Sequence, residues 1–109
     1  QNALETGNWL KEKLEALKES FPLIGDVRGE GFFLGVELVL DPETREPAPL
    51  QADYVVERMK SRKILLSTEG PGHNVLKFKP PMVFNQRDAQ HFLAELEQVL
   101  GESPLLQKR

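Results

Sequence analysis

The sequence contains no cysteine, which excludes disulfide bonds, thiolate catalysis and cysteine-based metal sites. Histidine is nearly as scarce, since only His73 and His91 are present and neither neighbours a convincing second metal ligand. A metal site and a Ser-His-Asp or Cys-His catalytic site are therefore not predicted. The lack of cysteine also fits a reducing compartment, so we expect a cytoplasmic protein, or one of the mitochondrial matrix if the source is eukaryotic.

Long hydrophobic runs and long basic runs are missing as well. No window approaches the ~18–20 apolar residues that cross a bilayer, and no signal peptide opens the chain. The net charge of −3 includes no basic run of the kind that binds nucleic acid, so we expect neither a membrane nor a nucleic acid among the partners. A chain of 109 residues supports one domain with a modest core. Because it starts at Gln1 inside a predicted helix, we expect it to be a piece of a longer protein.

Helical periodicity is present in three segments, residues 2–20, 50–61 and 86–100. The apolar positions predicted to face the core are Trp9, Leu10, Leu14, Leu17, Phe21, Ala52, Val55, Val56, Met59, Ala89, Phe92, Leu93, Leu96, Val99 and Leu100. Asn85 is suited to cap the last helix, with Asp88 in its first turn, and Gly101 is suited to end it. Residues 103–109 are predicted to be a tail, so that the domain covers residues 1–102.

Strand-like patterns occur in three further segments, residues 32–40, 63–67 and 74–84. The first is rich in large apolar side chains and is expected to be buried on both faces. Residues 21–27 before it are expected to be a short extended link. The last two strands, joined by a loop around Gly70-Pro71-Gly72, predict an antiparallel hairpin. The element order predicts an α+β fold, in which helices pack on one face of a small antiparallel or mixed three-stranded sheet.

The segment that leads into the Pro80-Pro81 pair carries two lysines on one face of its predicted strand. Lys77 and Lys79 point one way, while Leu76 and Phe78 point the other. Two cations on one face beside a rigid turn can hold an anion. The alternative, which spacing alone favours, is that the lysines lie on the wet face of an edge strand and discourage edge-to-edge pairing.

Three other features have both a functional and a structural interpretation. The run Arg28-Gly29-Glu30-Gly31 precedes a strand rather than a helix, so we interpret its glycines as allowing a bend and close packing rather than as a phosphate loop. Glu37 lies in an apolar strand and is expected to be solvated, or paired with Arg28, Lys77 or a partner chain. The hydroxyls of Ser67 and Thr68, beside a glycine-rich loop, can either bind a phosphate or cap the turn.

Taken as a whole, the chain resembles the C-terminal small domain of class-III (ornithine-aminotransferase-like) pyridoxal-phosphate enzymes. The matching segments are Val27-Arg28-Gly29-Glu30-Gly31-Phe32-Phe33-Leu34-Gly35-Val36-Glu37-Leu38, Leu65-Leu66-Ser67 and Val75-Leu76-Lys77-Phe78-Lys79-Pro80-Pro81-Met82. The helix after Asn85 also falls where the family has its last helix. The match runs in the same order over nearly all of residues 1–101.

The resemblance implies a homodimeric enzyme that uses pyridoxal 5′-phosphate and binds it through a lysine of a separate, larger domain. No stretch of this chain resembles that cofactor-lysine region, and none resembles the aspartate that pairs with the pyridinium nitrogen. The resemblance therefore places no catalytic and no cofactor-binding residue in this segment. It also implies that these 109 residues alone bind the cofactor poorly and catalyse nothing.

One position departs from the family pattern. Many transaminases of the family have, at the position of Lys77, an arginine that binds the substrate carboxylate with a planar fork that lysine lacks. Residues 67–71 and 77–82 are more similar to the phospho-lyase branch, the alanine-glyoxylate-aminotransferase-2-like enzymes. Those relatives act on phosphorylated amines such as ethanolamine phosphate or phosphohydroxylysine, releasing phosphate and ammonia and leaving an aldehyde. The resemblance implies that Lys77 stabilises the leaving phosphate, with Lys79 and Thr68 as weaker substrate-binding candidates.

Other functions stay open on the sequence. One is an ordinary omega-amino or alanine-glyoxylate transaminase that acts on a small amine or amino acid. Another is a stand-alone ligand-binding or regulatory module with the same small architecture. A third is an interaction domain whose exposed strand and helix faces bind a partner chain. A long upstream region with a strand-borne lysine in the parent protein would decide for an enzyme.

Overall fold

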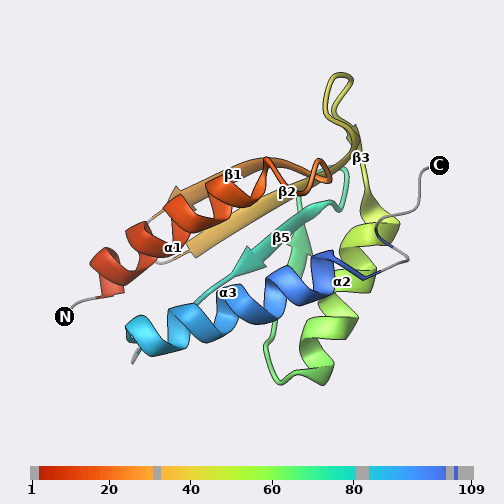
Figure 1. Cartoon of the computed structure of the whole chain (residues 1–109). Helices are drawn as coiled ribbons and strands as arrows, with labels where there is room; N and C mark the ends of the chain where they lie inside the picture. The colour runs from red at the N-terminus through yellow and green to blue at the C-terminus, as the bar shows by residue number, and fades with distance from the viewer. Residues whose placement is uncertain (1–2, 31–32, 81–83, 103–104, 106–109) are drawn as a thin grey trace.

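In the part of the chain that the structure describes, five antiparallel strands form a sheet with three helices on one face (Figure 1). The computed structural model describes residues 3–30, 33–80, 84–102 and 105. The elements are α1 (Ala3–Leu17), β1 (Ile24–Glu30), β2 (Phe33–Asp41), β3 (Glu46–Pro47), α2 (Pro49–Ser61), β4 (Ser67–Glu69), β5 (Val75–Phe78) and α3 (Gln86–Leu100). The strand order is β1-β2-β5-β4, and β3 pairs with β2 outside this row. The α+β class with helices on one face is confirmed, although the sheet has five strands rather than three.

The sequence pattern did not predict β1 and β3. The expected link at residues 21–27 is a paired strand from Ile24 onward. Two glycines and an aspartate in β1 are poor strand formers, so the local sequence gives little strand signal. The strand forms because β2 offers it a ladder that ends with Glu30 opposite Phe33. β3 has only two residues, one of them a proline, and pairs with the end of β2.

The prediction that the strand at residues 32–40 is buried on both faces is wrong for most of the described strand. Leu34, Val36 and Leu38 face the helices and are at most 4% exposed. On the other face, Phe33 is 37% exposed. The described helices all lie on one side of the sheet (Figure 1). The other face of β2 is therefore less covered, except at Val39, which pairs with β3 and is 1% exposed.

The prediction of a strand at residues 63–67 is also wrong, because the first of these residues terminate α2. Lys63 adopts a left-handed conformation with φ of 67°. Its N–H donates to the Lys60 carbonyl, and the N–H of Ile64 donates to the Met59 carbonyl, each at 2.9 Å. This pair of bonds is a Schellman motif, which satisfies the last carbonyls of a helix. The strand β4 therefore begins only at the last residue of the predicted range.

The three predicted helices are confirmed, and α3 has the predicted bounds. The predicted core positions that are fully buried are Leu10, Leu14, Ala52, Val55, Met59, Ala89, Phe92, Leu96, Val99 and Leu100. Those that are partly buried against the same core are Trp9, Leu17, Phe21, Val56 and Leu93. Phe92 stacks on Phe78 of β5, with ring centroids 4.1 Å apart, and so joins α3 to the sheet. Within the described residues, no helix combines the length and the apolar character needed to cross a membrane.

Both predicted ends of α3 are found. The Asn85 side chain accepts a hydrogen bond from the Asp88 N–H at 2.9 Å, and the Asp88 carboxylate accepts one from the Asn85 N–H at 3.2 Å, which is a capping box. Gly101 caps the other end. Of the predicted tail, Leu105 is described and packs on the core at 9% exposure. Residues 103–104 and 106–109 lie outside the described residues.

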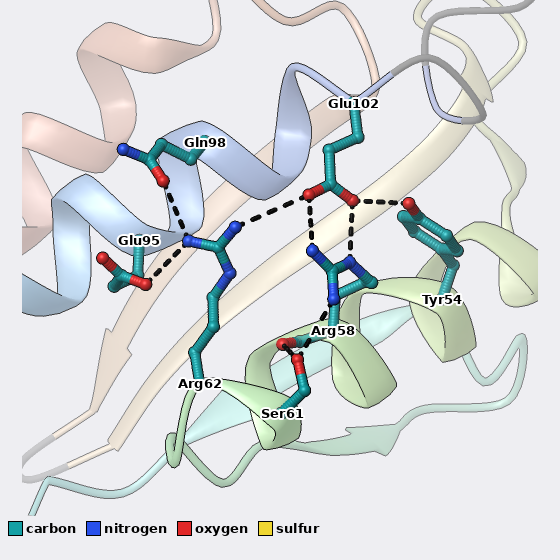
Figure 2. Close-up of polar contacts among 7 residues, drawn as sticks. All are labelled: Tyr54, Arg58, Ser61, Arg62, Glu95, Gln98 and Glu102. Carbon is teal, nitrogen blue, oxygen red and sulfur yellow. Dashed lines mark hydrogen bonds and ion pairs between the residues drawn. The ribbon is translucent and has the colours of Figure 1, made fainter.

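An ion-pair network fastens α2 to the end of α3 (Figure 2). Arg58 donates two hydrogen bonds of 2.9 Å to the Glu102 carboxylate, and the Tyr54 hydroxyl donates another. Arg62 lies 3.6 Å from Glu102 and 2.7 Å from Glu95. The two-pronged contact of a guanidinium with a carboxylate fixes the geometry as well as the charge. The network therefore holds the last turn of α3 against α2.

The network shifts the protonation equilibria of its members. The hydrogen bonds from Arg58 and Tyr54 lower the pKa of Glu102 from 4.5 to about 2, against the opposing effect of burial. The hydrogen bond to Glu102, together with burial, raises the pKa of Tyr54 above its ordinary value. The hydrogen bond and the charge of Glu102 also raise the pKa of Arg58. All three shifts favour the ionisation states that form the network.

Acid is expected to weaken this contact. Because the pKa of Glu102 is lower in the folded chain, the unfolded chain binds more protons at acid pH. The stabilisation by Glu102 is complete above pH ~4.5 and is lost as the pH falls through the folded pKa of about 2. Thermal unfolding across this range should show Tm falling less with acid in Glu102→Gln than in the unchanged chain. The control is Glu97→Gln, which removes a carboxylate from an exposed position of α3. If Tm falls equally with acid in the unchanged chain and in both variants, the acid sensitivity does not come from Glu102.

Candidate functional site

The strand β5 presents Lys77 in the interior of the sheet. It pairs with β2 on one side and with β4 on the other, so the edge-strand interpretation of its lysines is wrong. The predicted alternation is confirmed, because Leu76 and Phe78 face the helices at 3% and 8% exposure. Lys77 lies on the opposite, helix-free face, and Lys79 is exposed just beyond the end of β5.

Strand pairing arranges the side chains of the helix-free face in rows, since paired residues of neighbouring antiparallel strands project to the same face. One row, here called the basic row, consists of Arg28 (β1), Gly35 (β2), Lys77 (β5) and Ser67 (β4). The next row, here called the acidic row, consists of Asp26, Glu37, Val75 and Glu69. The two rows therefore place two cations, Arg28 and Lys77, beside three carboxylates.

An aromatic ring and a carboxylate hold the Lys77 side chain. Its Nζ lies 3.3 Å from a carboxylate oxygen of Glu69 and 4.3 Å from the ring centroid of Phe33. The Nζ of Lys79 lies 5.6 Å from the same ring. The face of an aromatic ring attracts ammonium groups, so Phe33 draws the two lysines together. The side chain of Lys77 nevertheless remains 34% exposed and available to a ligand.

Two hollows meet at Lys77. One, of about 600 Å³, extends to Arg28 and Gly35. The other, of about 400 Å³, extends to Lys79. Lys77 and Glu69 line both. A concave surface with several cationic side chains can accept a small anion such as a phosphate monoester.

The two hydroxyl candidates lie on opposite faces. Ser67 pairs with Lys77 and shares the basic row, whereas Thr68 pairs with Leu76 and projects to the helix-covered face. The structure therefore brings Lys77 and Lys79 together but does not bring the Thr68 side chain beside them.

The Glu37 carboxylate is paired within the chain. It accepts a hydrogen bond from Arg45 and lies 3.7 Å from Arg28. Of the partners predicted for Glu37, Arg28 is thus found, while Lys77 pairs with Glu69 instead. The side chain is 18% exposed, and its cationic neighbours compensate for this partial burial.

The histidines lie apart on the surface. His73 is exposed in the turn that follows β4, and His91 is exposed on α3. Across residues 3–30, 33–80, 84–102 and 105, no three histidine, aspartate or glutamate side chains are grouped so that they can hold a metal ion.

Three neighbours of Lys77 were not predicted as parts of its site. Glu69 has a sequence signal, because a predicted hairpin places the residues before its loop beside those after it. No sequence signal indicates Phe33 or Arg28, since their position near Lys77 depends on pairing between β1, β2 and β5. A register between strands so distant in sequence is not readable from local pattern.

The chain was then compared with known proteins. Residues 1–100 match the family described as Aminotransferase class-III. An alanine–glyoxylate aminotransferase 2-like protein of Drosophila melanogaster is 46% identical over 101 residues, which are 92% of this chain and 20% of that protein. The ethanolamine-phosphate phospho-lyase homolog 1 of Caenorhabditis elegans is 41% identical over 105 residues, covering 92% of this chain and 22% of the relative. A solved phospholyase from Arthrobacter in complex with phosphoethanolamine has 35% identity and a TM-score of 0.87 over 94% of this chain and 24% of that one.

These comparisons agree with the resemblance found in the sequence. The chain spans about a fifth of the length of the curated relatives that it matches, 20% in the Drosophila protein. The agreement covers both the residues and the arrangement of helices and strands. The chain therefore belongs to the class-III aminotransferase family.

Proposed function

We propose that this chain is the C-terminal small domain of a pyridoxal-phosphate enzyme with phospho-lyase activity on a phosphorylated amine of the ethanolamine phosphate or phosphohydroxylysine type. The products are inorganic phosphate, ammonia and an aldehyde. The observation that carries the proposal is Lys77, a lysine on a concave, helix-free sheet face. The family resemblance implies that many transaminases have a carboxylate-binding arginine at this position. The domain covers residues 1–102.

The surroundings of Lys77 suit a leaving phosphate. The ammonium is a compact point charge, which stabilises negative charge that develops on a phosphate oxygen. Phe33 and Glu69 hold the side chain at the junction of the two hollows. Lys79 lies near the same ring and adds a second positive charge. Thr68 stays a weaker candidate, because its side chain projects to the other face.

Similar proteins support the same reaction class. The relative from Caenorhabditis elegans is named as an ethanolamine-phosphate phospho-lyase homolog, and the solved Arthrobacter phospholyase is in complex with phosphoethanolamine. A second candidate is transamination of a small amine or amino acid, which is favoured by the name of the Drosophila relative, alanine–glyoxylate aminotransferase 2-like. Family membership argues against a stand-alone ligand-binding or interaction module.

The described residues of this chain do not fit the cofactor on their own. Holding pyridoxal phosphate requires a lysine that forms a Schiff base and a partner for the pyridinium nitrogen. Lys77 and Lys79 instead lie on an open sheet face, and the Nζ of Lys77 is paired with Glu69 at 3.3 Å. We therefore assign no cofactor-binding and no catalytic residue to this chain. The large domain of the parent protein is proposed to supply both.

The remaining partners follow from the same proposal. The parent enzyme is a homodimer, its substrate is a small amine, and its location is the cytoplasm or, in a eukaryote, the mitochondrial matrix. The large domain accounts for the four fifths of the relatives' length that this chain does not span, since the match covers 20% of the Drosophila protein.

Incubating the complete protein with pyridoxal phosphate and ethanolamine phosphate is expected to release inorganic phosphate and an aldehyde in equal amounts. The 109-residue chain alone should release no phosphate and should show no absorbance band of bound cofactor, because the groups that hold the cofactor are proposed to lie in the large domain. A colorimetric phosphate assay and an absorbance spectrum measure these outcomes. Transfer of the amino group to a keto acid without phosphate release would decide for a transaminase. Activity or a cofactor band in the 109-residue chain would contradict the assignment of catalysis to the large domain.

A further inference from the structure

We propose that Arg28 and Lys77 together form a two-cation site for a phosphate monoester dianion, which lies over Gly35 between them. The inference deepens the proposed phospho-lyase function and rests on it, because it adds Arg28 as a second residue that binds the phosphate of the substrate. In the sequence, Arg28 was singled out as the start of a glycine-containing run and as an expected partner of Glu37, not as a ligand of the substrate phosphate.

Strand register places the two cations on either side of a glycine. Arg28 pairs with Gly35, and Gly35 pairs with Lys77, so all three belong to the basic row. Neighbouring strands lie ~4.8 Å apart, so the backbones of Arg28 and Lys77 are separated by roughly 10 Å. Two long side chains can close this gap around one phosphate, each donating hydrogen bonds of about 2.8 Å. The hollow of about 600 Å³ that all three residues line provides the space.

The backbone conformation at Gly35, in the middle of the basic row, does not require glycine. A Cβ built on Gly35 would meet Val75 Cγ1 at 3.4 Å, a contact of ordinary length, and Gly35 does not have a positive φ. The fold can therefore carry a side chain at this position. What a longer side chain would remove is the open space between Arg28 and Lys77, which is the space that a bound anion needs.

Carboxylates of the acidic row pair with both cations. Arg28 Nε lies 3.2 Å from Asp26 and its guanidinium lies 3.7 Å from Glu37, while Lys77 pairs with Glu69. The side chains of Arg28 and Asp26 are 53% and 40% exposed, so water screens their pair and it is easily exchanged. A phosphate dianion offers each cation a full negative charge in return.

The same balance predicts selectivity for phosphate over carboxylate. A monoanionic carboxylate cannot compensate for two ion pairs that must be loosened, whereas a dianion can. The guanidinium of Arg28 adds a planar fork that matches two phosphate oxygens, and Lys77 adds a point charge. The site therefore takes a phosphate monoester in preference to an α-carboxylate.

The test measures binding of inorganic phosphate to the complete protein, saturated with pyridoxal phosphate, by isothermal titration calorimetry at fixed ionic strength. Arg28→Gln is expected to raise the phosphate Kd at least tenfold, and Arg28→Lys to raise it less. Gly35→Leu, which keeps both cations but fills the hollow, is expected to weaken binding as strongly as Arg28→Gln. The control is Arg87→Gln, the same change of charge at an exposed position of α3, which should leave Kd within twofold. A thermal melt of each variant shows whether it is folded.

The inference is overturned if the unchanged protein binds no phosphate, or if both Arg28→Gln and Gly35→Leu bind phosphate within twofold of it. The outcome is separable from that of the proposed function. If phosphate binding depends on Arg28 but ethanolamine phosphate yields no phosphate, the phospho-lyase proposal fails and the two-cation site stands. If phosphate is released and the KM for ethanolamine phosphate is the same in Arg28→Gln, the phospho-lyase proposal stands and the role of Arg28 is overturned.

Discussion

Replacing Lys77 by alanine in the complete enzyme is expected to lower kcat/KM for ethanolamine phosphate by about 10²-fold. A preorganised group that faces charge developing in a transition state typically contributes about 10²–10³ in rate. Lys77 fits this description because its Nζ is held between Phe33 and Glu69 at the junction of two hollows. Its partly exposed ion pair contributes little to stability, so Tm should change by only a few degrees. Steady-state phosphate release measures the effect.

Two variants sharpen this experiment. Lys77→Arg is expected to retain part of the phospho-lyase activity and to improve transamination of amino acids, because the guanidinium fork matches a carboxylate. Lys60→Ala, at an exposed position of α2, is the matched control and should leave kcat/KM unchanged. An unchanged kcat/KM in Lys77→Ala would remove Lys77 from the site. A similar loss in Lys60→Ala would show that the effect reflects overall charge rather than position.

Replacing Phe92 by alanine is expected to lower the free energy of unfolding by about 3–5 kcal/mol. Phe92 is 3% exposed and stacks on Phe78 with centroids 4.1 Å apart, so its removal leaves a cavity between α3 and the sheet. Domains of this size are stabilised by only about 5–15 kcal/mol, so the variant should be close to unfolding. Urea denaturation followed by circular dichroism measures the change as a lower midpoint with the same m-value.

The control for Phe92 is a neighbouring position on the exposed side of the same helix. Gln90→Ala should change the free energy of unfolding by less than about 0.5 kcal/mol, because Gln90 is exposed. A loss below about 1 kcal/mol in Phe92→Ala would mean that the site collapses around the smaller side chain and that the stacked pair does not join α3 to the sheet.

Helix prediction succeeded because its signals are local. The positions that repeat on one face of a helix, such as Leu10, Leu14 and Leu96, are buried as predicted. Asn85 and Gly101 mark the ends of α3 through bonds with residues a few positions away. Capping and amphipathic periodicity depend on neighbours within one or two turns, so one sequence is enough to reveal them.

Strand prediction was less complete because strands depend on partners. The segment at residues 24–30 is a strand because β2 pairs with it, although its glycines and aspartate favour other conformations. The segment at residues 63–67 has strand-like composition, but its first residues close α2 through a Schellman motif. In both cases a contact absent from the local pattern decided the outcome.

The candidate site divides in the same way. The alternation of residues 75–79 determined that Lys77 projects away from Leu76 and Phe78, and the family resemblance determined which position it occupies. Lysine in place of arginine determined the kind of anion that we propose. These conclusions require only the order of residues in one strand.

The tertiary structure decided what surrounds Lys77. It placed β5 inside the sheet rather than at its edge, set Phe33 and Glu69 against the ammonium, and aligned Arg28 with it across Gly35. A strand pattern has a period of two and shows which face a residue joins, but it does not show which strand lies beside it. The sequence by itself therefore determined the helices, the family and the lysine. The pairing of distant strands, fixed by burying one common core, decided that the lysine belongs to a row of charges around a hollow.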